Sequence, residues 1–263
     1  MKRIICAAFA LCFAACKSPP VPQGHLALFG GTGVISLATP LTKNTSSLPL
    51  GWLMVGVPGQ FAIADIVTYG GPKLKITAPP GWTLIREDMN PIVPVKGDPP
   101  LRQLLYWHFV RPNDPGLQIW NFSERVDAQG TLILLDNISP ADPIDAHSGN
   151  PAQNFDNPLA ESVTTSQPGD LVLIFYSTNY GGPGLAPLMP CSPESARQPI
   201  HVSIPGFGRI VDHSDIENEY WVDAAFQGMP GKTPDAVSII VQPTKWIAAQ
   251  VALRRTIPPP ALQ

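Results

Sequence analysis

The sequence predicts an all-β protein, an antiparallel two-sheet sandwich with a jelly-roll-like arrangement of strands. Proline and glycine are abundant, with 32 and 22 residues in a chain of 263, and both disfavour long helices. The apolar residues fall in short runs separated by turn residues, which is typical of strands. One short stretch, 215–219, is expected to form a single helical turn, and no longer segment has a helical period with caps.

Each predicted strand is an apolar or alternating run bounded by glycine, proline or polar turn residues. The glycine-rich segment 30–33 separates the first two runs, and we interpret it as a hairpin turn because no helix follows to cradle a phosphate. Pro58 and Gly59 form the next turn, and 112–116 and the acidic segment 124–130 form two more. The predicted strands are, in chain order, 24–30, 33–38, 51–57, 61–69, 102–110, 117–122, 131–138, 170–178, 199–212, 218–226, 236–241 and 246–254.

A short basic segment, an apolar run and a cysteine stand in that order at the N-terminus. Lys2 and Arg3 precede the apolar residues 4–15, and Cys16 follows. The run is too short to span a bilayer, which needs about 20 residues, so it indicates a secretory signal peptide. With a cysteine at the cleavage point it resembles a bacterial lipoprotein signal, which implies that Cys16 carries the lipid. An ordinary signal peptide cut nearby is the alternative.

This interpretation divides the chain into four parts. They are a signal peptide at 1–15, the lipidated cysteine with a proline-rich tether at 16–24, a single β-sandwich domain at 25–255, and a proline-rich tail at 256–263. Lys17 follows the cysteine, in place of the aspartate that marks inner-membrane retention. The resemblance therefore implies an exported protein that a lipid anchors to the outer membrane.

Charge and cysteine content argue against several classes of function. The formal net charge is −3, and loss of Lys2 and Arg3 with the signal makes the mature chain more acidic. A mildly acidic chain without a basic stripe argues against nucleic acid or anionic lipid headgroups as partners. Cys191 is the only cysteine beyond the signal and the lipidation site, so no intramolecular disulfide is expected.

The sharpest local string is Ile-Thr-Ala-Pro-Pro-Gly-Trp-Thr-Leu-Ile-Arg at 76–86. It resembles an I-T-x-P-x-G-W-T-L-I-R element of secreted bacterial and phage-associated β-sandwich domains. Further parts follow in the order of that group, at 51–71, 104–110, 136–149, 168–178 and 246–254. The resemblance implies a jelly-roll-like sandwich and supplies no catalytic residues. In physical terms, Trp82 is expected to plug the end of the sandwich, with Leu84 on the same face.

The densest polar cluster of the sequence is at 212–219. Asp212, Asp215 and Glu217 are carboxylates that, with neighbouring hydroxyl and amide oxygens, could surround Ca²⁺, which prefers six to eight oxygen ligands. The spacing is not that of an EF-hand loop, and a solvated connection between strands is the alternative. No other cofactor is expected.

A second polar cluster lies in and beside the first of two long predicted loops, 139–157 and 180–199. Its Asx-Pro and Ser-Pro steps indicate successive turns in which Asp and Asn cap their own backbone, and a loop-borne ligand or ion site is the alternative. The residues of this cluster are Asp136, Asn137, Asp142, Asp145, His147 and Asp156.

Aromatic residues alternate along two predicted strands. Trp107 and Phe109 share one face of their strand, and Tyr106 and His108 share the other, which is semi-polar and expected to be exposed. Core packing is one interpretation of such a set. In the other, Tyr106, His108 and Trp120 form an open platform that stacks on sugar rings.

The sequence contains no G-x-S-x-G elbow and no H-x-H or H-E-x-x-H pair. We therefore expect a non-enzymatic, membrane-anchored binding or adhesion lipoprotein in the periplasm or on the cell surface. A glycan or an envelope protein is the expected partner. A structural subunit of an envelope or phage-derived assembly is the alternative, and a hydrolase with no recognisable motif is the third.

Overall fold

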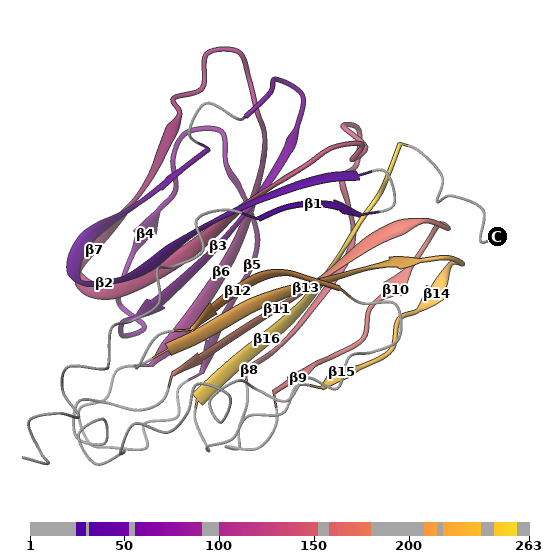
Figure 1. The fold of residues 1–263 in the computed structure, drawn as a ribbon. Helices are drawn as coiled ribbons and strands as arrows, with labels where there is room; N and C mark the ends of the chain where they lie inside the picture. Colours follow the sequence, from indigo (N-terminus) through magenta and orange to yellow (C-terminus); the bar gives the residue numbers. More distant parts are fainter. Residues whose placement is uncertain are drawn as a thin grey trace, which may run out of the picture.

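All secondary structure in the described residues is β-strand, and most of it lies in two antiparallel sheets packed against each other (Figure 1). The structure, a computed structural model, describes residues 25–29, 32–52, 56–90, 100–151, 158–179, 208–214, 218–237 and 245–256. The predicted all-β, two-sheet sandwich is confirmed. No helix long and apolar enough to cross a membrane is found in the part of the chain that the structure describes.

The first sheet contains seven strands and the second contains five. In spatial order the first runs β1 (His25–Phe29), β2 (Thr32–Gly51), β7 (Leu117–Leu135), β3 (Phe61–Tyr69), β6 (Leu101–Phe109) and β5 (Thr83–Asn90), and β4 (Ile76–Thr77) pairs with β7 beside this path. The second runs β12 (Gly208–Ser214), β13 (Asn218–Gln227), β11 (Asp170–Asn179), β16 (Lys245–Leu253) and β8 (Ile144–Pro151). Phe29 pairs with Thr32, as the predicted first hairpin requires.

An apolar core fills the space between the two sheets. Phe61 and Ile63 of β3 pack there with Leu171, Leu173 and Phe175 of β11, all of them buried. Successive side chains of a strand point to opposite faces, so the residues between them face away from this core. Since both faces of β3 and β11 are covered, these strands are continuous apolar runs rather than alternating ones.

The outer face of the first sheet is covered by the sheet's own longest strands. β2 and β7 pair along their length and curve together, as Figure 1 shows. Leu48 and Leu50 of β2 and Trp120 of β7 belong to a second core with Ala62 and Ala64 of β3. The β2–β7 register shifts three times between Thr39 and Ser47, and such irregularities bend a strand.

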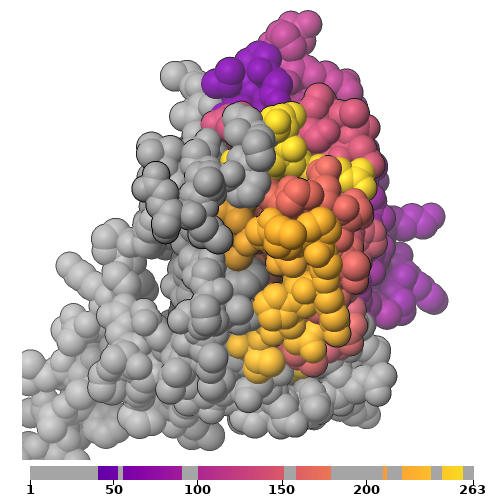
Figure 2. Space-filling view, turned by 90° about the vertical axis from the view of Figure 1, so that its right-hand side faces the viewer, coloured from indigo at the N-terminus to yellow at the C-terminus, as the bar shows by residue number. Residues whose placement is uncertain are grey.

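Two short strand pairs cover the outer face of the second sheet: β9 (Leu159–Ala160) with β15 (Ala236–Val237), and β10 (Thr164–Thr165) with β14 (Gly231–Lys232). Figure 2 looks onto this side, where the orange segments that precede β16 lie beside the salmon ones that precede β11. Beneath them, Tyr176 stacks on Trp221 at 4.9 Å. Gln250 ties the cover down, because its amide donates to the carbonyl oxygens of Ala160 and Pro234.

The structure corrects several local predictions. The predicted turn at 124–130 is wrong, since β7 continues through it with Val126 and Ala128 buried. The predicted loop at 139–157 contains β8. Of the predicted strand at 51–57, Gly51 is the last residue of β2, Trp52, Gly56 and Val57 are not in a strand, and 53–55 lie outside the described residues. Leu84 pairs with Tyr106, which packs with Trp82 in the second core, so Leu84 and Trp82 share a face as predicted, but the Leu84 side chain is exposed. The predicted loop at 180–199 lies outside the described residues. Of the predicted helical turn at 215–219, residues 215–217 also lie outside them, and Asn218 and Glu219 begin β13 instead.

Candidate functional site

The residues predicted to form a sugar-stacking platform lie inside the protein. Tyr106, His108 and Trp120 have exposed fractions of 6%, 2% and 0%, and all three pack in or against the second core, on the outer face of the first sheet. Of the two interpretations of the aromatic set, the structure agrees with core packing and not with an open platform, and the expected exposure of Tyr106 and His108 is wrong, because the bent β2–β7 ladder covers this face. Trp107 and Phe109, on the opposite face, pack against the core between the sheets.

His108 is the polar centre of that aromatic core. Its Nε2 bonds Asp114 Oδ2 at 2.6 Å and its Nδ1 bonds the Gly81 carbonyl oxygen at 3.0 Å. Both partners only accept hydrogen bonds, so both contacts are satisfied when each ring nitrogen carries a proton. Trp52 lies parallel to the His108 ring at 6.3 Å, and Trp82 lies at 5.3 Å. Partial burial of Asp114 favours its neutral acid, but the bonds from His108 and the Arg111 amide outweigh this and lower the pKa of Asp114.

The predicted calcium ligands fall where the structure gives no side chains. Asp215 and Glu217 lie outside the described residues, and of Asp212 only the backbone in β12 is described. Calcium binding there stays a prediction. Among the residues with described side chains, no group of three His, Cys, Asp or Glu residues could hold a metal ion.

The second polar cluster of the sequence is divided by the fold. Asp136 accepts a hydrogen bond from Gln60, and His147 lies 3.1 Å from an Arg86 nitrogen. Burial, followed by the charge of Arg86, lowers the pKa of His147. Asp156 is outside the described residues. Asp142 and Asp145 do come together, because both bind Arg254.

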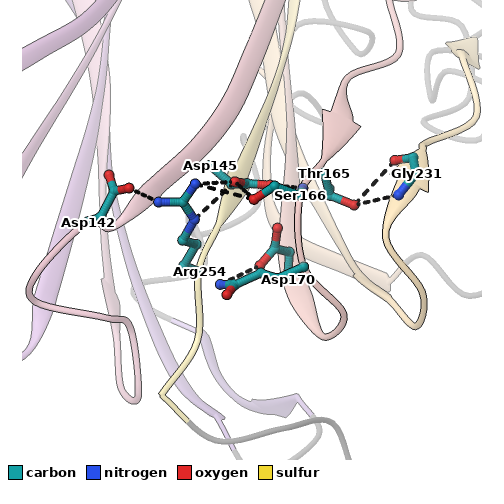
Figure 3. A network of polar contacts seen from close by, with 8 residues as sticks. Asp142, Asp145, Thr165, Ser166, Asp170, Gly231 and Arg254 are labelled. Atoms are coloured by element: carbon teal, nitrogen blue, oxygen red, sulfur yellow. Dashed lines mark hydrogen bonds and ion pairs between the residues drawn. The ribbon is translucent and has the colours of Figure 1, made fainter.

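Arg254 is the centre of the polar network drawn in Figure 3. It follows β16, and its Nε and Nη2 donate to Asp145 Oδ1 at 2.9 and 2.6 Å, while another nitrogen pairs with Asp142. Ser166 donates to Asp145 through its backbone N and its Oγ, each at 2.5 Å. Guanidinium groups suit such multiple contacts with carboxylates, and here they hold β8, β16 and the turn before β11 together.

Asp170, the first residue of β11, is a member of this network that the sequence analysis missed. Its side chain is fully buried, and its Oδ1 lies 3.3 Å from the Gln167 amide nitrogen. Burial, then the hydrogen bond and charge of Asp145, raise the pKa of Asp170 to about 7. A carboxyl that holds its proton near neutrality has the chemistry of a general acid, but no substrate reaches one that is fully buried.

A second carboxyl whose pKa is raised lies between the sheets. Asp65 of β3 is buried, and its Oδ2 accepts a 3.0 Å hydrogen bond from Gln103 Nε2, which also bonds Ser177 Oγ of the facing sheet. Two oxygens of this pair, Asp65 Oδ1 and Gln103 Oε1, have no donor. If Asp65 Oδ1 carries a proton, it can donate to Gln103 Oε1, and the two side chains then form an acid–amide pair with two hydrogen bonds. Burial raises the pKa of Asp65 to about 7, although the Gln103 hydrogen bond lowers it.

Fold and site together define an antiparallel β-sandwich in which buried polar side chains tie sheets, covers and turns to one another. Comparison with protein-family models, with curated proteins and with solved structures gives no match to this chain.

Proposed function

We propose that the chain is a non-enzymatic, lipid-anchored binding or adhesion protein of the bacterial envelope. The observation that carries the proposal is the position of the first strand. β1 begins at His25, so only 17–24 separate a lipid on Cys16 from the folded body. An extended tether of that length spans roughly 25 Å at about 3.1 Å per residue. The anchor would hold the sandwich close to the membrane surface.

The anchor is tested by a Cys16→Ser variant. Wild-type protein grown with a labelled fatty acid should carry the label and fractionate with the outer membrane, because several buried acyl chains hold a protein firmly. The variant should lose the label and leave the membrane fraction. Cys191→Ser is the matched control and should behave as wild type. Label retained by Cys16→Ser, or absent from wild type, would refute the anchor.

The best-supported contact surface is the outward face of β7. Leu117 and Ile119 alternate on it with exposed fractions of 49% and 42%, and Ile119 is paired with exposed Pro49 of β2. Neighbouring exposed apolar side chains are typical of surfaces that bind other molecules. This face lies on the bent β2–β7 ladder, where the side chains of opposite parity anchor it to the second core.

Binding through this face is tested with the double variant Leu117→Ser, Ile119→Ser. Wild-type protein should retain a specific envelope protein or glycan in pull-down and glycan-array experiments, and the double variant should retain at least tenfold less of it. Met229→Ser is the control, because Met229 is more exposed and lies on the far cover, in the turn before β14. Equal retention by the double variant would exclude this face, and turnover of an ester or glycoside would overturn the non-enzymatic function.

A further inference from the structure

We propose that Asp170, Asp145 and Arg254 form a pH-sensitive latch that holds the turn before β11, and through it the β10–β14 pair, against the second sheet. The latch is closed while Asp170 carries a proton and loosens when that proton is lost. It acts in the folded body and does not depend on the lipid anchor or on the binding surface.

The latch begins at Asp145, whose side chain is only 1% exposed. Its two oxygens accept hydrogen bonds from Arg254 and from Ser166. The neighbouring Thr165 hydroxyl lies 3.2 Å from both the carbonyl oxygen and the amide nitrogen of Gly231 in β14. Figure 3 shows this chain of contacts from Arg254 to the cover strands. A displacement of Asp145 therefore reaches β10 and β14 through two adjacent residues.

Asp170 places a second carboxyl against Asp145. Asp145 is within hydrogen-bonding and charge–charge reach of it, while Asp170 Oδ2 is buried and has no donor. Two carboxyls attract each other only with a proton between them. Because Asp145 already accepts bonds from Arg254 and Ser166, the shared proton belongs on Asp170.

Loss of that proton changes the charge balance of the cluster. The charged groups described around Asp170 are Asp145, Arg254 and, beyond Arg254, Asp142. The next residue, Arg255, is turned to the Phe226 ring, with its guanidinium carbon 4.5 Å from the ring centre. Ionised Asp170 therefore adds a negative charge beside Asp145, whose own carboxylate shares Arg254 with Asp142, and the repulsion falls on the contact between Asp145 and Asp170. The raised pKa of Asp170 puts this change near neutral pH.

Hydrogen exchange at pH 6 and pH 8, corrected for the intrinsic rate, tests the latch. In wild-type protein, protection of the amides at 164–169 should fall at least tenfold between the two pH values. Asp170→Asn keeps a neutral donor beside Asp145 and should abolish that fall. Asp65→Asn, which removes the other buried carboxyl, is the matched control and should leave the fall in place.

Three results would overturn the latch: no loss of protection at 164–169 in wild type, an equal loss in Asp170→Asn, or loss of the response in Asp65→Asn. A second measurement does not depend on a variant that folds well. In wild-type protein labelled at the aspartate carboxyl carbons, the Asp170 signal should titrate near neutrality together with the Ser166 amide. An Asp170 signal that titrates near pH 4 would also refute the proposal.

Discussion

Replacing Asp65 with asparagine should raise the free energy of unfolding by about 2–4 kcal/mol at pH 8 and leave it nearly unchanged at pH 4. Burial raises the pKa of Asp65 to about 7 from an ordinary 3.8. The folded state thus keeps a proton that the unfolded chain releases, so the contribution of Asp65 to stability falls as pH rises from about 4 to 7. Each unit of pKa corresponds to about 1.4 kcal/mol. Asparagine is never charged, so the free energy of unfolding of the variant does not decrease through ionisation at this position.

The local structure should accept the asparagine. Its carbonyl oxygen takes the hydrogen bond from Gln103 Nε2, and its amide offers the donor that Gln103 Oε1 lacks. Urea unfolding at several pH values measures the effect. Asp114→Asn is a control of opposite sign, since hydrogen bonds lower the pKa of Asp114 and its stabilising effect is lost as pH falls. An Asp65→Asn curve parallel to that of wild type would contradict a protonated Asp65.

The fold class followed from local sequence, because glycine-bounded apolar runs such as 61–69 and 170–178 are β3 and β11 almost residue for residue. The bend of β7 could not be predicted from local sequence. Ser123, Glu124 and Arg125 point outward and are exposed, so locally they are indistinguishable from a turn. What keeps them in a strand is pairing with β2, which bends at the same place. That partner is about 80 positions away in the chain and can be known only from the folded structure.

The candidate sites were less predictable than the strands. The sequence pointed to Asp145, but its partners Asp170 and Arg254 stand at the ends of apolar runs 25 and 109 residues further along. Neither has a local signal, since only folding places three strand ends together. Asp65 did have one: it is the sole charged residue in the run 61–69. A lone carboxylate in a strand buried on both faces must find a partner or keep its proton.

Replacing Trp120 with alanine should lower the free energy of unfolding by about 3–5 kcal/mol, the usual cost of removing a large buried ring. Trp120 is fully buried, packs edge-on against Trp82 at 5.0 Å and lies 6.2 Å from the Tyr106 ring. Its loss would leave a cavity between the bent β2–β7 ladder and β3. Urea unfolding followed by circular dichroism at pH 6 measures the effect without relying on tryptophan fluorescence.

Two matched variants separate core packing from a role in binding. Trp120→Phe should lose only about 1 kcal/mol, because phenylalanine fills most of the space and removes an indole N–H that has no acceptor. Ile119→Ala, at the exposed neighbour on the same strand, should change stability by less than about 0.5 kcal/mol. If the Trp120→Ala protein were as stable as wild type but bound a glycan or envelope partner more weakly, Trp120 would have to lie at the surface and contribute to binding. Its burial beneath the ladder predicts the opposite, since a side chain that holds two layers together cannot be removed without loosening both.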